Sequence, residues 1–207
     1  MDTPLPKLRA LETFSVDQIR CALAGHAPRI IRPTAKHAAV AAVLHETASG
    51  TEVLFIERAE HPGDPWSGHM AFPGGRVDPG DATPQHAAER ETREEVGIEL
   101  ASAERLGRLD DVEGAPPGFD SLVVSAFVYH LERRVTPTLN YEVRDALWVP
   151  MATLLDSSRH VPFFWPREQR EMHYPGILVG QPERHVVWGL TYRFVELFFT
   201  ALGRPIR

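Results

Sequence analysis

The sequence predicts a mixed α/β (α+β) fold, in which helices pack against a mixed β-sheet. Short apolar runs typical of strands alternate with helical patterns, in the order βββαββ…βα. The 207 residues, of which 43% are hydrophobic and 24% charged, suit one globular domain with a sizeable core. The chain contains no internal repeat and no low-complexity segment, so one domain with a terminal addition is expected.

The N-terminal segment is expected to form a short helix ahead of the main domain. Ser15 and Gln18 have the spacing of a capping box, which would open a helix through about Ala24. Two prolines within residues 28–36 indicate a linker. We therefore divide the chain into an N-terminal extension, residues 1–36, and a main domain, residues 37–207.

Strands of the main domain are indicated by aliphatic and β-branched runs between turn residues. Ser49-Gly50 separates two such runs and predicts a hairpin, and the longest run, Leu122–Leu131, is expected to be a central strand. Residues 157–187, rich in proline, histidine and aromatics, are expected to form a strand pair with an irregular loop. The other expected strands are Ala38–Leu44, Val53–Ile56, Met70–Phe72, Leu100–Leu109 and Ala146–Val149.

Two longer helices are expected in the main domain. Pro84 suits the first turn of a helix that runs to Val96. The segment Trp188–Leu202 has apolar residues at helical spacing and predicts an amphipathic terminal helix. A short helix is expected near Thr153, after Pro150 stops the preceding strand.

The first of these helices carries the strongest functional signal. Glu91, Glu94 and Glu95 are spaced i, i+3 and i+4, which places three carboxylates on one helical face. Packed like charges weaken a helix unless a cation cancels them, and a hard divalent cation prefers oxygen ligands. A solvated acidic face is the alternative interpretation. The Gly74-Gly75 turn before the helix and a glycine after it favour a loop–helix–loop that holds a metal ion.

This segment resembles a Nudix box, G-x5-E-x7-R-E-U-x-E-E-x-G-U, where U is aliphatic. Gly75, Arg90-Glu91, Glu94-Glu95 and Gly97-Ile98 match the pattern. The segment departs from the pattern at three points. Asp81 replaces the first glutamate, eight residues rather than seven separate it from Arg90, and the polar Thr92 occupies an aliphatic position. The resemblance implies a Nudix-type α/β/α sandwich with a mixed β-sheet.

Residues 72–81 also read F-P-G-G-x-x-D-P-x-D, as in coenzyme A pyrophosphatase-like Nudix hydrolases. That subgroup carries an upstream signature, L-L-T-x-R-[S/A]-x3-R-x3-G-x3-F-P-G-G, which Arg58, Ala59 and Gly68 match. The stretch between Ala59 and Gly68 is one residue too long and lacks the second arginine, which could pair with a 3′-phosphate. Residues 187–191 are similar to the subgroup's I-W-G-x-T.

The resemblance implies roles for several residues. Glu91, Glu94 and Glu95 are expected to bind Mg²⁺ or Mn²⁺ and to be catalytic. Glu142 lies in a loop where many Nudix enzymes carry a glutamate that reaches a metal or acts as general base; a solvated loop residue is the equal alternative. Arg90 is expected to tie the helix to a carboxylate of the box. The expected substrate-binding residues are Arg58, Arg76, Gly74 and Gly75.

The expected function is metal-dependent hydrolysis of a pyrophosphate bond in a nucleoside diphosphate derivative. Coenzyme A or its acyl derivatives is the favoured substrate, giving 3′,5′-ADP and 4′-phosphopantetheine. ADP-ribose, a dinucleotide or an oxidised nucleoside triphosphate is the alternative within the same chemistry. A Nudix-fold nucleotide-binding regulatory module without turnover is the alternative of another class.

Composition narrows the partners and the location. The net charge of −6 argues against a general nucleic-acid binder, which needs a basic face. Cys21 is the only cysteine, so no intrachain disulfide can form, and a reducing compartment is favoured. The first residues contain no long apolar stretch, so neither a signal peptide nor a membrane span is expected. We expect a cytoplasmic protein that binds a small-molecule nucleotide, with a homodimer compatible with the sequence.

Overall fold

The computed structural model of the chain describes residues 13–32, 36–62, 64, 66–114, 121–167 and 170–206, without the side chains of residues 165–172. The expected N-terminal extension, residues 1–36, lies partly outside these described residues. The proline, glycine and acidic residues of 60–67 and 113–118 also predict loops. The middle of the first and the end of the second lie outside the described residues.

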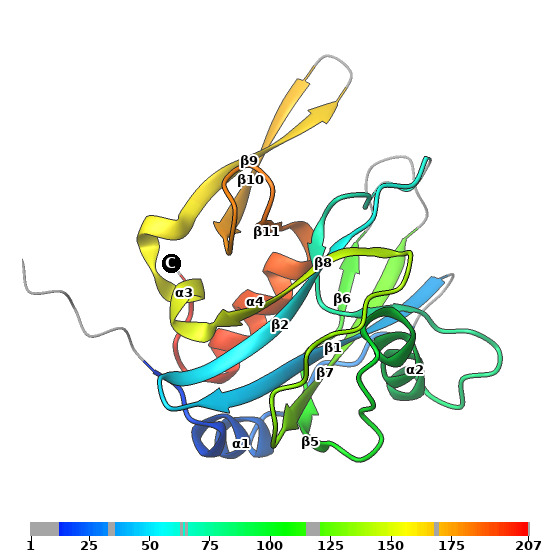
Figure 1. The fold of residues 1–207 in the computed structure, drawn as a ribbon, viewed down its shortest axis with the longest axis vertical. Helices are drawn as coiled ribbons and strands as arrows, with labels where there is room; N and C mark the ends of the chain where they lie inside the picture. Colours follow the sequence, from blue (N-terminus) through cyan, green and yellow to red (C-terminus); the bar gives the residue numbers. More distant parts are fainter. Residues whose placement is uncertain are drawn as a thin grey trace, which may run out of the picture.

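The main sheet is mixed, as the sequence predicts. Its central strands are β1 (Lys36–Thr47), which pairs antiparallel with β2 (Gly50–Arg58) and parallel with β7 (Leu122–Leu131). The hairpin between β1 and β2 turns at the predicted Ser49-Gly50. The strands of this sheet lie in the order β3-β2-β1-β7-β5. Its strands β2, β1 and β7 lie side by side in Figure 1. Its remaining strands are β3 (Met70–Ala71), β4 (Gly74–Arg76), β5 (Glu104–Arg108), β6 (Val112–Gly114) and β8 (Val143–Pro150).

Helices cover both faces of this sheet. On β1, Ala39 and Ala41 face the helix α2 (Pro84–Val96), because alternate side chains of a strand lie on one face. The intervening Ala38 and Ala42 face a second core, which includes the buried side of α4 (Gly189–Ala201). The α/β/α sandwich predicted by the sequence is therefore confirmed.

The helix α1 (Val16–Ala24) belongs to this second core. Ser15 and Gln18 form the predicted capping box. Ile19 and Leu23 are buried, and Gly107 of β5 admits Leu23 closely, since a Cβ at Gly107 would lie 2.9 Å from the Cβ of Leu23. The N-terminal helix is thus packed against the main sheet.

Several expected boundaries differ from the structure, and three of the differences have a clear local reason. The strand predicted from Leu100 begins at Glu104, because residues 101–103 form a turn. The strand predicted from Ala146 begins at Val143, because its ladder with β2 extends that far. Residues 113–114, predicted as loop, lie in β6 and pair with β7.

A second, three-stranded sheet follows the short helix α3 (Met151–Leu155) and a 3₁₀ turn (Ser157–Arg159). The expected strand pair in residues 157–187 is present as β9 (His160–Arg167) and β10 (Arg170–Leu178), and β11 (Val186–Trp188) adds a third strand. The outer part of β9 and β10 projects from the body as an arm (Figure 1). No helix among the described residues is both long and apolar enough to cross a membrane.

Candidate functional site: the carboxylate helix

The helix α2 begins and ends where the local sequence predicts. The Thr83 hydroxyl caps its start by accepting a hydrogen bond from the backbone N–H of His86 at 3.2 Å, and Pro84 follows in the first turn. Gly97 ends it in the left-handed conformation, with a φ of 68° that favours glycine. The three glutamates therefore occupy one regular helix.

Glu95 is the most deeply buried of the three, with 2% of its surface exposed. One of its carboxylate oxygens accepts a hydrogen bond from the backbone N–H of Gly74 at 2.8 Å. Burial raises its pKa to about 8, although the Gly74 N–H and the Arg58 charge act against this rise. A buried carboxylate with so little compensation is stabilised by a bound cation.

Glu91 lies against the glycine turn. A Cβ at Gly75 would be 2.5 Å from the Glu91 carboxyl carbon, so the turn has room for this carboxylate only because residue 75 has no side chain. Burial raises the pKa of Glu91, opposed by the neighbouring Arg90. Glu94 is more exposed and accepts a hydrogen bond from Arg90 at 3.2 Å. The turn and the helix thus form one cradle.

Arg90 ties this cradle together. Its guanidinium donates two hydrogen bonds to Asp81, at 3.0 and 2.9 Å, and one to the Arg76 carbonyl at 3.1 Å. It also donates to Glu91 at 3.0 Å. These contacts join the box turn to α2 through the aspartate that departs from the box pattern. One arginine offsets only part of the negative charge of the helix face.

The loop that carries Glu142 runs along the C-terminal end of α2. The backbone N–H groups of Thr138 and Asn140 donate to the carbonyls of Val96 and Glu95, at 2.9 and 3.1 Å. Glu142 is anchored through its own backbone, and its negative charge contributes to the raised pKa values of Glu91 and Glu95. The structure therefore brings Glu142 to the helix glutamates.

The two candidate substrate arginines differ in their surroundings. Arg58 donates to Asp64 at 2.9 Å, and its positive charge lowers the pKa of Glu95. Its Nε atom is buried with no hydrogen-bond partner among the described residues. Arg76 is exposed, and its carbonyl accepts the hydrogen bond from Arg90. Arg58 is therefore close enough to Glu95 for its charge to oppose the rise in the pKa of that carboxyl.

A second carboxylate cluster lies at the edge where β2 meets β8. Glu57, Asp145 and His185 bring ligand atoms within 4.8 Å of one another, which is a metal-like arrangement. However, Arg184 already holds Glu57, with contacts of 2.9 and 2.5 Å to one carboxylate oxygen. We call these four residues the Glu57 network.

The proton on His185 also argues against a metal ion in the Glu57 network. Its Nδ1 accepts the backbone N–H of Gln181 at 3.0 Å, so the neutral ring carries its proton on Nε2. That N–H lies 3.6 Å from oxygens of Glu57 and Asp145, where it faces carboxylates and offers no lone pair. Sequence reasoning missed this network; the only signal was a charged residue directly after the apolar run Val53–Ile56.

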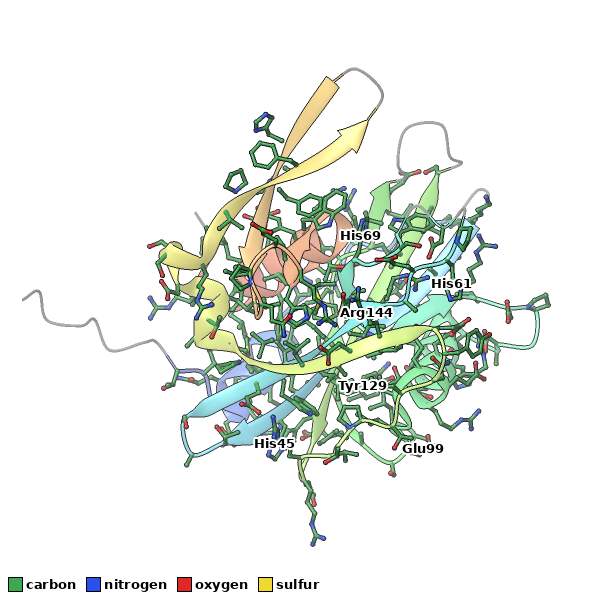
Figure 2. All side chains as sticks on the ribbon, turned by 45° about the horizontal axis from the view of Figure 1, so that its top comes forward. His45, His61, His69, Glu99, Tyr129 and Arg144 are labelled. Atoms are coloured by element: carbon green, nitrogen blue, oxygen red, sulfur yellow. The ribbon has the colours of Figure 1, made fainter. Side chains whose placement is uncertain are left out.

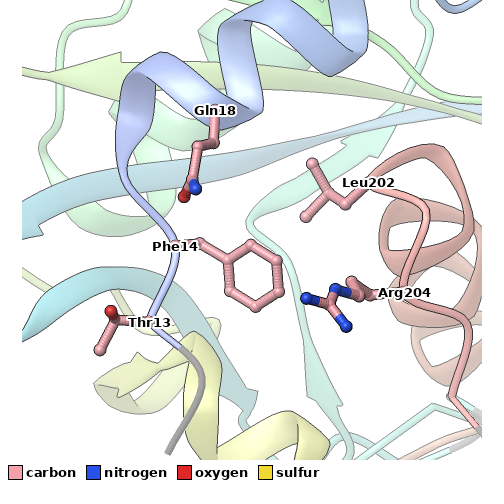
Figure 3. A pocket seen from close by; sticks show the side chains of 5 residues that line it. All are labelled: Thr13, Phe14, Gln18, Leu202 and Arg204. Atoms are coloured by element: carbon pink, nitrogen blue, oxygen red, sulfur yellow. The ribbon is translucent and has the colours of Figure 1, made fainter.

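A cavity of about 330 Å³ lies elsewhere, between the start of α1 and the C-terminal end (Figure 3). Its lining comes from the terminal segments, and none of it belongs to the box. The residues are Thr13, Phe14, Gln18, Leu202 and Arg204. The chemistry of the carboxylate helix is thus separate from this cavity.

A family model described as the NUDIX domain matches residues 35–170. The human mitochondrial coenzyme A diphosphatase NUDT8 is 30% identical over 90% of this chain and 78% of its own length. A Nudix hydrolase NudL from an Enterobacter species is 32% identical over 73% of this chain and 75% of its own. An uncharacterised Schizosaccharomyces pombe protein is 38% identical over 56% of this chain. The matched region covers only 40% of that protein's length.

Solved structures share the fold. A MutT/nudix family protein from Enterococcus faecalis superposes with a TM-score of 0.54 at 16% identity, covering 87% of this chain and 66% of that one. A Caenorhabditis elegans Ap4A hydrolase superposes with a TM-score of 0.50 at 22% identity, and the match covers 58% of this chain and 84% of that one. The chain belongs to the Nudix family and is a pyrophosphohydrolase, and its resemblance to the coenzyme A pyrophosphatase-like members is confirmed.

Proposed function

We propose that this protein hydrolyses the pyrophosphate bond of a nucleoside diphosphate derivative at the face of α2, with coenzyme A or an acyl derivative as substrate. The observation that carries the proposal is the contact of two buried glutamates with the glycine turn: Glu95 accepts the N–H of Gly74, and the carboxylate of Glu91 lies against Gly75. Burial raises the pKa of both carboxyls, and the turn holds them without a side chain between. Carboxylates arranged in this way suit a divalent cation.

A divalent metal ion is the cofactor that the family implies, and the residues present fit it. Glu91, Glu94 and Glu95 would hold it, with Mg²⁺ or Mn²⁺ as the ion, because both accept carboxylate oxygens in a cage left open to substrate. When bound, the ion neutralises phosphate oxygens and lowers the pKa of a bound water. Such a cation also removes the electrostatic cost of the buried Glu95 charge.

The protein's own residues account for positioning and proton transfer. Glu142 is the candidate general base, because its loop is hydrogen-bonded to the end of α2 and its charge acts on Glu91 and Glu95. Arg58, beside Glu95, is the candidate cation for the substrate's diphosphate. Arg90 has a positioning role through Asp81 and the box turn.

The substrate assignment draws on similarity to a relative named as a coenzyme A diphosphatase. Against it stands the missing upstream arginine, whose segment here contains Asp64 paired with Arg58. Arg58 or Arg76 would then have to bind the 3′-phosphate. ADP-ribose, a dinucleotide or an oxidised nucleoside triphosphate is the alternative substrate. Three further statements stay predictions: a homodimer, the absence of nucleic-acid binding and a cytoplasmic location. The human relative is named as mitochondrial.

The test is incubation with Mg²⁺ or Mn²⁺ and a panel of nucleotide derivatives, with products identified by mass. Release of 3′,5′-ADP and 4′-phosphopantetheine from coenzyme A supports the proposal. A comparison with 3′-dephospho-coenzyme A then asks whether the 3′-phosphate is recognised: equal rates would exclude its recognition by Arg58 or Arg76. Binding of nucleotides without any product would favour the regulatory module.

A further inference from the structure

Four aromatic side chains from distant parts of the chain meet beside the second sheet. Trp188 stacks on Phe163, with ring centroids 4.2 Å apart and planes at 16°. His69 meets the edge of Trp188 at 4.6 Å, and Tyr174 lies 5.4 Å from it. We call these four residues the aromatic group. They come from β9, β10, β11 and the residue before β3, so only the tertiary structure assembles them.

The aromatic group is connected to Arg58, whose charge acts on Glu95 of the carboxylate helix. The His69 carbonyl accepts the backbone N–H of Arg58 at 3.0 Å, and Figure 2 shows His69 near the start of α4. Gly74, which donates to Glu95, follows His69 by five positions. An extended chain of that length places the two residues at most about 17 Å apart. A ligand with a diphosphate at α2 would therefore have its remaining part within reach of these rings.

The aromatic group is uncharged near neutral pH. Burial lowers the pKa of His69 to about 4, so its ring is neutral and presents an aromatic surface. Phe163, Tyr174 and Trp188 are each partly exposed. Each of these rings therefore keeps part of its apolar surface open to solvent. Flat, partly exposed rings beside a phosphate site suit a flat heteroaromatic ligand.

We propose that the aromatic group binds the base of the nucleotide substrate by stacking, an inference that rests on the proposed function for the place of the diphosphate. Stacking is tolerant of the base's hydrogen-bonding edge, because every base has a π-face. The aromatic group would thus position the base of the substrate. The diphosphate would lie at Arg58 and at the metal ion held by the carboxylates.

The strand β9 offers a matched control. Phe163 and Phe164 are adjacent, so their side chains lie on opposite faces of the strand. Phe163 contacts Trp188, whereas Phe164 contacts His173 at 4.6 Å and is 51% exposed. Phe163→Leu and Phe164→Leu therefore remove the same aromatic ring from the same strand, once inside the aromatic group and once outside it.

The experiment measures binding of ADP and of inorganic pyrophosphate, which lacks a base, by calorimetry with Mg²⁺ present. We expect Phe163→Leu to weaken ADP binding about tenfold or more and to leave pyrophosphate binding unchanged, and Phe164→Leu to change neither. Equal ADP affinity in the two variants would overturn the inference. A parallel loss of pyrophosphate binding in Phe163→Leu would also overturn it.

A second measurement needs no variant and covers the case in which Phe163→Leu fails to fold. Saturation transfer from the protein's aromatic protons to ADP in the wild-type protein should be strongest at the base protons. A stronger signal at the ribose protons, or no ADP binding, would contradict the inference. Neither measurement requires turnover, so binding through Phe163 without hydrolysis of any diphosphate would reject the proposed function and keep the base site.

Discussion

Two buried glutamates, Glu57 and Glu95, have opposite electrostatic surroundings. Glu57 and Glu95 are 1% and 2% exposed. Glu57 is held by the guanidinium of Arg184 and faces the Nε2–H of His185, so its charge is matched by protein groups. Glu95 has one backbone N–H, and its pKa is raised to about 8. Both regions contain clustered carboxylates, yet of these two glutamates only Glu57 forms an ion pair among the described residues.

Proximity of carboxylates therefore does not by itself identify a metal site. In the Glu57 network the arginine occupies the position where a cation would bind, and the histidine tautomer directs a proton at the carboxylates. On α2 one arginine serves Asp81, Glu91 and Glu94 together, and Glu95 is left outside its reach. The uncompensated charge, rather than the spacing, is what a divalent ion would stabilise.

The largest effect is expected from Glu142→Ala. If Glu142 takes the proton from the attacking water, turnover falls on the order of 10²–10⁴-fold and the acidic limb of the pH–rate profile disappears, while substrate binding persists. Steady-state kinetics across pH measure both. Turnover within about twofold of the wild type would assign Glu142 to the solvated loop and leave the helix glutamates as candidate bases.

Glu95→Gln is expected to lower turnover by about two or more orders of magnitude, because it removes a charge from the cation cage at constant volume. The matched control on the same helix is Glu89→Gln, whose carboxylate accepts a hydrogen bond from Tyr129 at 2.8 Å on another side of α2. That control should keep its activity. Near-normal turnover of Glu95→Gln at saturating metal would refute the assignment of this site.

Gly75→Ala is expected to lower turnover by about tenfold or more with little change in stability. The new methyl group would displace the end of the flexible Glu91 side chain, so it disturbs a ligand more than the backbone. Gly80→Ala is the control in the same turn, since nothing lies within 4 Å of its Cβ position. Rates and thermal melts of both variants would separate a local effect at Glu91 from a general effect of the turn.

The pH dependence of stability in metal-free protein tests the burial of Glu95. The pKa of Glu95 rises from 4.5 in the unfolded chain to about 8 in the fold. The folded state therefore holds more protons than the unfolded state across about pH 4.5–8, and stability falls as pH rises through that window. Glu95→Gln should flatten this slope, and Mg²⁺ should oppose it. Thermal melts in chelator at pH 5 and pH 8 measure the change.

The smallest effect on turnover is expected in the Glu57 network. Arg184→Met leaves Glu57 buried without its main partner and should lower the melting temperature by several degrees. Adding Glu57→Gln should recover much of that loss, because the buried charge is gone. If the double variant were less stable than Arg184→Met alone, the charge-balance explanation would be wrong. A metal-dependent rise in wild-type stability that both variants abolish would instead favour a metal there.

The local elements follow from residues that are close together in the sequence. Capping at Thr83, proline in the first turn and glycine at residue 97 define α2, and the i, i+3, i+4 spacing alone places its glutamates on one face. The capping box at Ser15 and the Ser49-Gly50 turn were likewise readable, because the residues that make these contacts are neighbours in the chain. The approach of the Glu142 loop to α2 was expected only through the resemblance to the Nudix family.

The pairing of charges and of aromatic rings that are far apart in the sequence depends on the tertiary structure. Arg184 reaches Glu57 across 127 positions of the chain, and His69 meets Trp188 from another sheet. No local periodicity encodes such partners, because their pairing depends on which strands become neighbours. Burial follows the same rule: the 2% exposure that raises the pKa of Glu95 arises from the packed turn and sheet around it, although its position in the sequence shows only an acidic residue on a helix.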